Sequence, residues 1–145
     1  MEIIIGIGLD NIIFGMSQEE IKSILGEPDK INSEEIDYGI VYYFNKEMLV
    51  VKFDKDENFK LYSIESFNPE IKMFNKRIMK KSKDSIKTLL RKKGYTKVGY
   101  QEYDSFDTLY FEEIRTTLMF EFDRLRSIEF SPLLKNDDEI IWPSR

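Results

Sequence analysis

The residues that could carry out chemistry in this chain are carboxylates, lysines, serines and tyrosines, because the 145-residue sequence contains no histidine and no cysteine. Their absence excludes His-based triads, thiolate nucleophiles, disulfides and the usual zinc sites. Two carboxylate pairs, Glu19-Glu20 and Glu112-Glu113, are adjacent in the sequence. Neighbouring residues face apart on a strand and on a helix, so neither pair forms a dyad. We expect a protein that is not an enzyme; a carboxylate enzyme assembled from distant strands is the alternative.

One turn has the ligand spacing of a calcium loop. Asp54, Asp56, Asn58 and Glu65 fall at positions 1, 3, 5 and 12 of that pattern. The sixth position, which needs glycine for a sharp bend, is Phe59, and the flanking segments alternate like strands instead of helices. We therefore expect a polar hairpin turn here, and no metal or other cofactor.

A second group of polar side chains mixes carboxylates with aromatic rings, a combination typical of protein interfaces. Residues 102–107 read Glu-Tyr-Asp-Ser-Phe-Asp, where a simple polar turn would suffice. An acidic stretch with a tyrosine lies at the matching place in the first half of the chain. The predicted partner-binding residues are Glu102, Tyr103, Asp104, Phe106 and Asp107, with Glu34, Glu35, Asp37 and Tyr38 as a second patch. The alternative is that Tyr103 and Phe106 point into the core.

Charge is strongly segregated along the chain. Residues 1–70 carry 15 acidic and 6 basic groups, residues 71–100 carry 1 and 11, and residues 101–145 carry 11 and 5. Such blocks create local potentials that steer charged partners. Nucleic-acid binding through a basic stripe at residues 83–97, with Tyr95 and Tyr100 for stacking, is one interpretation. We favour a solvated helix face, because the chain as a whole is acidic.

A short helix beginning after Ser17 organises the first half of the chain. Ser17 and Glu20 have the spacing of a capping box, the apolar residues that follow recur at i, i+3 and i+4, and Gly26-Glu-Pro28 is a stop signal. The pattern returns in the second half, where Ser17, Ile21, Ile24 and Leu25 match Ser82, Ile86, Leu89 and Leu90. Further matches keep the same order: Tyr43-Phe44 with Tyr110-Phe111, Phe53-Asp54 with Phe122-Asp123, and Ser63-Ile64-Glu65 with Ser127-Ile128-Glu129.

The repeated pattern indicates a tandem duplication within a single domain, with units at about 1–69 and 70–133 and a C-terminal tail at 134–145. Each unit is too small for a core of its own. We expect an α+β fold in which two tandem helix-plus-antiparallel-strand repeats form one continuous antiparallel sheet with both helices on one face. Residues 2–7 should be a first strand covered on both faces, and residues 140–142 an edge strand or a loose segment.

The first residues, Met-Glu-Ile-Ile-Ile-Gly-Ile-Gly, lack the basic region of a signal peptide, and no apolar run approaches the length of a membrane span. We expect a cytoplasmic protein with no membrane partner.

The segment Phe14–Asp29 resembles the helix signature of β-lactamase-inhibitor-protein-like and SmpA/OmlA-like repeats. In those repeats Gly-Met/Thr-Ser/Thr-x-x-x-Val/Ile precedes Leu-Gly-x-Pro, as it does here in residues 15–28. The hairpin at Phe53–Leu61 also looks like theirs, whereas in the second unit Leu-Gly-x-Pro has become Leu90-Arg-Lys-Lys-Gly94. The resemblance implies a helix-plus-sheet module that binds proteins through a concave sheet face.

Members of those families are usually exported or lipid-anchored, with a cysteine or signal that this sequence lacks. A cytoplasmic relative with acidic patches is similar instead to bacterial immunity proteins, which cover the active site of a cognate toxin. Acidic surfaces suit a basic toxin domain such as a nuclease, because the inhibitor then mimics phosphate charge and binds faster. By this analogy we expect a toxin inhibitor.

Overall fold

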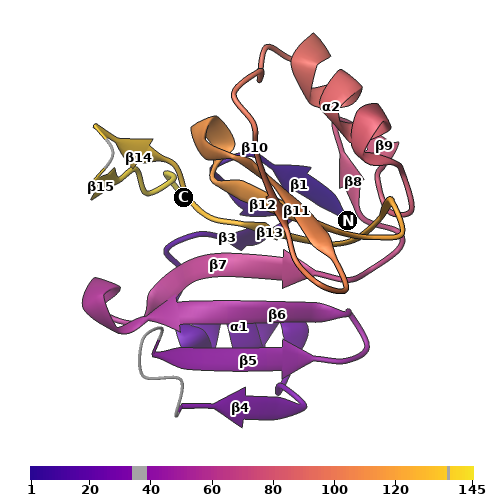
Figure 1. The fold of residues 1–145 in the computed structure, drawn as a ribbon. Helices are drawn as coiled ribbons and strands as arrows, with labels where there is room; N and C mark the ends of the chain where they lie inside the picture. The colour runs from indigo at the N-terminus through magenta and orange to yellow at the C-terminus, as the bar shows by residue number, and fades with distance from the viewer. Residues whose placement is uncertain (34–38, 137) are drawn as a thin grey trace.

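The computed structural model is an α+β structure built on an eight-stranded antiparallel sheet (Figure 1). It describes residues 1–33, 39–136 and 138–145. The strand order across the sheet is β10-β11-β12-β13-β7-β6-β5-β4. These strands are β4 (Lys30–Asn32), β5 (Ile40–Phe44), β6 (Leu49–Asp54), β7 (Lys60–Ser66), β10 (Gly99–Glu102), β11 (Asp107–Phe111), β12 (Thr116–Glu121) and β13 (Arg124–Phe130). The expected α+β class and antiparallel sheet are confirmed.

The two helices form where the capping signals predict them. Helix α1 (Gln18–Leu25) begins with a complete capping box, in which the Ser17 hydroxyl accepts from the Glu20 N–H at 3.2 Å and the Glu20 carboxylate accepts from the Ser17 N–H at 3.1 Å. Helix α2 (Lys83–Lys92) begins at Ser82, whose hydroxyl accepts from the Ser85 N–H at 3.1 Å. The i, i+3, i+4 pattern turns Ile21 inward on α1 and Ile86 and Leu90 inward on α2.

One face of the large sheet carries the core. The register places Phe111, Thr116, Phe130, Ile64, Val51 and Tyr42 side by side across it, and all six are buried. Helix α1 packs on this face, since the Tyr42 hydroxyl donates to Gln18 at 2.6 Å. Helix α2 packs on the same face, because Lys83 lies 5.5 Å from the ring centre of the buried Phe120. The opposite face has neither helix on it.

A second, five-stranded sheet was not expected. Its order is β3-β2-β1-β8-β9, and β1 pairs with β8 in parallel. The strands are β1 (Glu2–Ile4), β2 (Gly8–Leu9), β3 (Ile12–Ile13), β8 (Lys72–Met73) and β9 (Lys76–Arg77). The strand expected over residues 2–7 is therefore shorter, and it is not covered on both faces, because Ile4 is 44% exposed. Ile3, Leu9 and Met73 join the core instead.

The last residues lie outside the large sheet. Strands β14 (Leu134–Lys135) and β15 (Glu139–Ile140) form a separate hairpin, so the tail is not an edge strand of the main sheet. Trp142 and Arg145 follow this hairpin. The Lys60 ammonium group lies 5.1 Å from the ring centre of Trp142, and Arg145 forms an ion pair with Glu20 of α1. Among the described residues, no helix combines the length and apolar character needed to cross a membrane.

Each half of the large sheet is a four-stranded meander that follows one helix. Both meanders have a register shift at the same place, between Lys52 and Phe53 in β6 and between Met119 and Phe120 in β12. Phe53 and Phe120 each follow such a shift and are buried, whereas Phe122, which the sequence match aligned with Phe53, is 93% exposed. The turn after β12 is shorter than the turn after β6, which contains the 3₁₀ helix η1 (Lys55–Glu57).

Candidate functional site

The β10–β11 hairpin carries the predicted partner-binding residues at its tip. The Tyr103 N–H donates to the Phe106 carbonyl at 2.9 Å, which closes the turn. The two rings stack with their centres 4.6 Å apart and their planes at 19°. Tyr103 is 49% exposed and Phe106 36% exposed. The alternative that these rings lie in the core is therefore wrong; they form a preformed aromatic pair on the surface.

A third aromatic ring lies at the neighbouring turn, between β12 and β13. Phe122 is 93% exposed, and its backbone has a positive φ of 51° in the tight turn. The two turns border one hollow of about 550 Å³. We call its rim the acidic-aromatic surface, defined as Glu102, Tyr103, Asp104, Phe106, Glu121, Phe122 and Asp123. The sequence analysis missed Glu121, Phe122 and Asp123, because cross-strand proximity was needed to find them.

Lys83 holds the two turns together. Its ammonium group lies 2.9 Å from the Asp107 carboxylate and 3.1 Å from the Asp123 carboxylate, and its backbone N–H donates to Asp123 at 3.0 Å. The Tyr100 hydroxyl also donates to Asp107, at 2.9 Å. These bonds explain why Asp107, a predicted contact residue, is only partly exposed and already paired. Asp107 positions the hairpin, whereas Glu102 and Asp104 remain at the surface.

The ion pairs set the charge states at this site. The hydrogen bond from Lys83 is the main reason why the pKa of Asp107 lies below its ordinary value. The pKa of Asp123 is lowered chiefly by the Lys83 backbone N–H. The pKa of Lys83 is raised, mainly by Asp107. Lys83 therefore stays paired at neutral pH, and the rest of the rim is acidic.

The second predicted patch, Glu34, Glu35, Asp37 and Tyr38, lies outside the described residues.

A different polar cluster lies at the centre of the open sheet face, and the sequence analysis did not identify it. The Lys52 ammonium is 2.8 Å from the Glu129 carboxylate, which also accepts from the Ser63 hydroxyl at 3.2 Å. Glu65 pairs directly opposite Glu129 in the β7–β13 register. The pKa of Glu65 is raised, first by burial and then by the charge of Glu129. Beside this cluster lies a hollow of about 500 Å³, lined in part by Tyr43, Met48, Val50, Lys52, Glu65 and Phe67.

The calcium-loop pattern does not form a calcium loop. The Asp54 carboxylate accepts from the Asp56 N–H at 2.8 Å and so caps η1. Glu65, which would be the last ligand, faces Glu129 across the β7–β13 pair. Within the described ranges, no group of three acidic side chains is arranged to hold a metal ion.

Comparison with known proteins extends the description of the fold. No protein-family model matches the chain, and a search of the curated proteins gave no significant match. One similar structure is an extracellular protein containing an SCP domain from Bacillus anthracis, with a TM-score of 0.52 and 13% identity over 84% of this chain and 44% of that one. Another is a DUF4309 family protein, YjgB, from Bacillus subtilis, with a TM-score of 0.51 and 12% identity over 88% of this chain and 82% of that one.

This chain thus spans less than half the length of the Bacillus anthracis protein. At such low identities, the likeness concerns the fold alone.

Proposed function

We propose that this protein is a non-catalytic binding module that neutralises a basic toxin domain by docking its acidic-aromatic surface over the toxin's active site. The observation that carries the proposal is the exposed Tyr103–Phe106 stack, which lies on one hollow with Phe122. Rigid aromatic anchors that are already ordered lose little conformational entropy when a partner covers them.

The charge of the surface selects a basic partner. Glu102, Asp104 and Glu121 surround the rings. Among the described residues that line the hollow, the single basic one, Lys83, is already paired with two carboxylates. An acidic surface accelerates association with a basic protein and disfavours acidic ones. A nuclease domain fits this description, since its active site must attract phosphate groups and is covered well by carboxylates.

An immunity role would place the protein in the cytoplasm, where the toxin acts. The resemblance of the segment Phe14–Asp29 to inhibitor-type repeats supports a binding function. The Bacillus anthracis neighbour is described as extracellular, so cell fractionation is the direct measurement of location. Recovery of the protein in the culture medium would contradict an immunity role inside the cell.

We also infer that the two halves are tandem copies of one helix-plus-meander unit. The shared register shift of β6 and β12 supports this inference, as does the recurrence of Leu-x-Ser-Ile-Glu in β7 and β13. Glu65 and Glu129, which are equivalent in the two copies, pair with each other at the junction. The duplication predicts that replacing Phe53 or Phe120 with alanine lowers the free energy of unfolding by a similar amount, because both rings are fully buried.

The proposal is tested with the protein encoded beside this one. Its toxin domain should arrest growth when expressed alone, and co-expression of this protein should restore growth. Binding is measured by calorimetry with the purified pair. The variant Tyr103→Ala with Asp104→Ala should weaken binding by roughly 2–4 kcal/mol, or about 30- to 1,000-fold, because it removes a central ring and a neighbouring charge.

A matched control removes an exposed ring and an exposed carboxylate elsewhere. Phe59→Ala with Asp56→Ala makes the same chemical change in the turn between β6 and β7. It should leave binding unchanged, and both variants should keep the wild-type melting temperature. A toxin that binds both variants equally well, or a neighbouring product with no toxicity that this protein relieves, would refute the proposal.

A further inference from the structure

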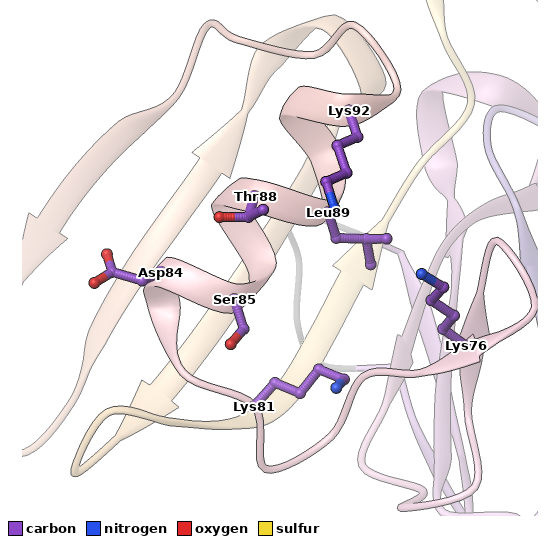
Figure 2. Close-up of a pocket in the computed structure, with 7 residues that line it drawn as sticks. All are labelled: Lys76, Lys81, Asp84, Ser85, Thr88, Leu89 and Lys92. Carbon is purple, nitrogen blue, oxygen red and sulfur yellow. The ribbon is translucent and has the colours of Figure 1, made fainter.

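A groove between helix α2 and strand β9 gathers basic side chains on the part of the molecule richest in positive charge. Figure 2 shows Lys76 from β9, Lys81 from the segment before α2 and Lys92 from the last turn of α2 converging beside Leu89. The groove has a volume of about 350 Å³. We call it the basic groove, defined as Lys76, Lys81, Asp84, Ser85, Thr88, Leu89 and Lys92.

The walls of the basic groove are held in place by the surrounding fold. The backbone carbonyl of Lys81 accepts from the Leu125 N–H at 2.9 Å, and the Lys80 N–H donates to the Leu125 carbonyl at 2.9 Å. These bonds fix the segment before α2 to the start of β13. At the other end, Lys93 lies 5.0 Å from the ring centre of Phe74, which joins the end of α2 to the β8–β9 turn. The backbone segments that carry the three lysines are therefore held in place by these contacts.

These lysines have no ion-pair partner among residues 1–33, 39–136 and 138–145. The ion pairs of this region involve other residues: Arg77 pairs with Glu70, and Lys83 with Asp107 and Asp123. Among the described residues that line the groove, the one acidic residue is Asp84, and its side chain points away from Leu89 (Figure 2). Three unneutralised ammonium groups around one hollow repel each other, so an anion bound among them would gain Coulomb energy.

The distribution of charge beyond the groove favours a long anion with repeated charges. Residues 71–100 carry 11 basic groups and one acidic group. Four of these basic groups continue outside the groove on α2 and just after it, as Lys87, Arg91, Lys93 and Lys97. A nucleic-acid strand presents one phosphate per nucleotide and can occupy such a series, whereas a single small anion uses only the groove.

We propose that the basic groove binds a phosphate of a single-stranded nucleic acid, whose backbone then follows α2 without sequence preference. In the part of the chain that the structure describes, no exposed aromatic ring lines the groove to stack on a base, so recognition rests on phosphate charge. The surface is distinct from the acidic-aromatic surface, and this inference goes beyond toxin neutralisation. The two functions are separable, because they use different residues.

The test measures binding of fluorescein-labelled oligothymidine by fluorescence anisotropy between 50 and 200 mM salt. Three phosphate contacts predict a slope of log K against log salt of about −2, or a loss of about 16-fold in affinity over this range. The variant Lys76→Gln, Lys81→Gln and Lys92→Gln should lose at least 10-fold in affinity at 50 mM salt and most of the slope.

The matched control makes the same change of net charge elsewhere, through Lys46→Gln, Lys55→Gln and Lys135→Gln, which are all exposed. It should bind oligothymidine like the wild type, and thermal unfolding should show that both variants fold. The groove variant should still bind the toxin domain, which separates this proposal from the first.

Several results would overturn the proposal. Absence of saturable binding at 50 mM salt would show that repulsion of the oligonucleotide by the acidic remainder of the chain outweighs its attraction to the groove. If both triple variants lost the same affinity for oligothymidine, binding would depend on the net charge of the protein alone. Polyglutamate competing as well as oligothymidine would identify an acidic-peptide site, and inorganic phosphate competing at the same concentration of phosphate groups would identify a site for a free anion.

Discussion

Replacing Glu65 with glutamine tests the electrostatics at the centre of the open sheet face. Glu65 and Glu129 lie directly opposite each other where the two meanders join. Lys52 forms its ion pair with Glu129 at 2.8 Å, and the Ser63 hydroxyl donates to the same carboxylate, so Glu129 is the better stabilised of the two carboxylates. Burial and the charge of Glu129 raise the pKa of Glu65. The ionised form of Glu65 therefore opposes folding.

The magnitude follows from the geometry. Like charges directly opposite on neighbouring strands destabilise a sheet by about 0.2–1 kcal/mol, and partial burial adds to that cost. We expect Glu65→Gln to increase the free energy of unfolding by about 1 kcal/mol at pH 7.5. For a chain of this size, that corresponds to a rise in melting temperature of about 3–4 °C.

The pH dependence has a defined sign. A carboxyl whose pKa is higher in the folded state binds more protons there, so stability falls as pH rises from the ordinary glutamate pKa of 4.5 through the folded value. At pH 3.5 the wild-type carboxyl is protonated and similar in shape to glutamine, and the two proteins should be equally stable. The difference in stability should grow as the pH rises from 4.5 through the folded pKa of Glu65 and should then stay constant.

The assay is urea unfolding followed by circular dichroism at intervals between pH 3.5 and 7.5. Glu129→Gln is the matched control, because it makes the same substitution but breaks the ion pair with Lys52. It should lower stability at pH 7.5. A destabilised Glu65→Gln, or a stability gain that does not change with pH, would refute the assignment of Glu65 as the strained member of the pair.

Three further predictions concern the core, a helix cap and the hairpin bridge. Phe120→Ala should cost about 3–5 kcal/mol because it leaves a cavity, whereas Phe122→Ala should change stability by less than about 0.5 kcal/mol; urea unfolding separates them. Ser17→Ala should cost about 1 kcal/mol by removing the cap of α1, and Ser17→Asp should restore it, as measured by thermal melts. Lys83→Met should cost on the order of 1 kcal/mol and speed amide exchange at Tyr103, because the bridge to Asp107 is lost; unchanged exchange would show that the hairpin holds its shape alone.

Local signals in the sequence were sufficient to place both helices and the strands that flank the turn after Asp54. The caps at Ser17 and Ser82 act over three residues, so they can be read without knowing the fold. Alternation of apolar and polar residues identified β6, where Leu49, Val51 and Phe53 are buried in turn. The segregation of charge is also a property of the chain itself, and it pointed to both of the surfaces for which we propose partners.

The second sheet escaped sequence analysis because its strands are only two or three residues long. Such strands carry no measurable alternation. The parallel pairing of β1 with β8 joins residues that are 70 positions apart in the sequence, such as Glu2 and Lys72, and only the shared core brings them together. Strand pairing over this distance depends on packing, which no local pattern encodes.

The sequence by itself determined which residues could act: carboxylates and rings at 102–107, and lysines across 71–100. Only the tertiary structure decided which of them meet. It exposed Tyr103, paired Asp107 with Lys83 and brought Phe122 to the same hollow. The physical reason is that the contacts of a side chain across a sheet depend on register and on where each strand ends: Phe120 lies within β12 and enters the core, whereas Phe122 lies in the turn that follows and is exposed.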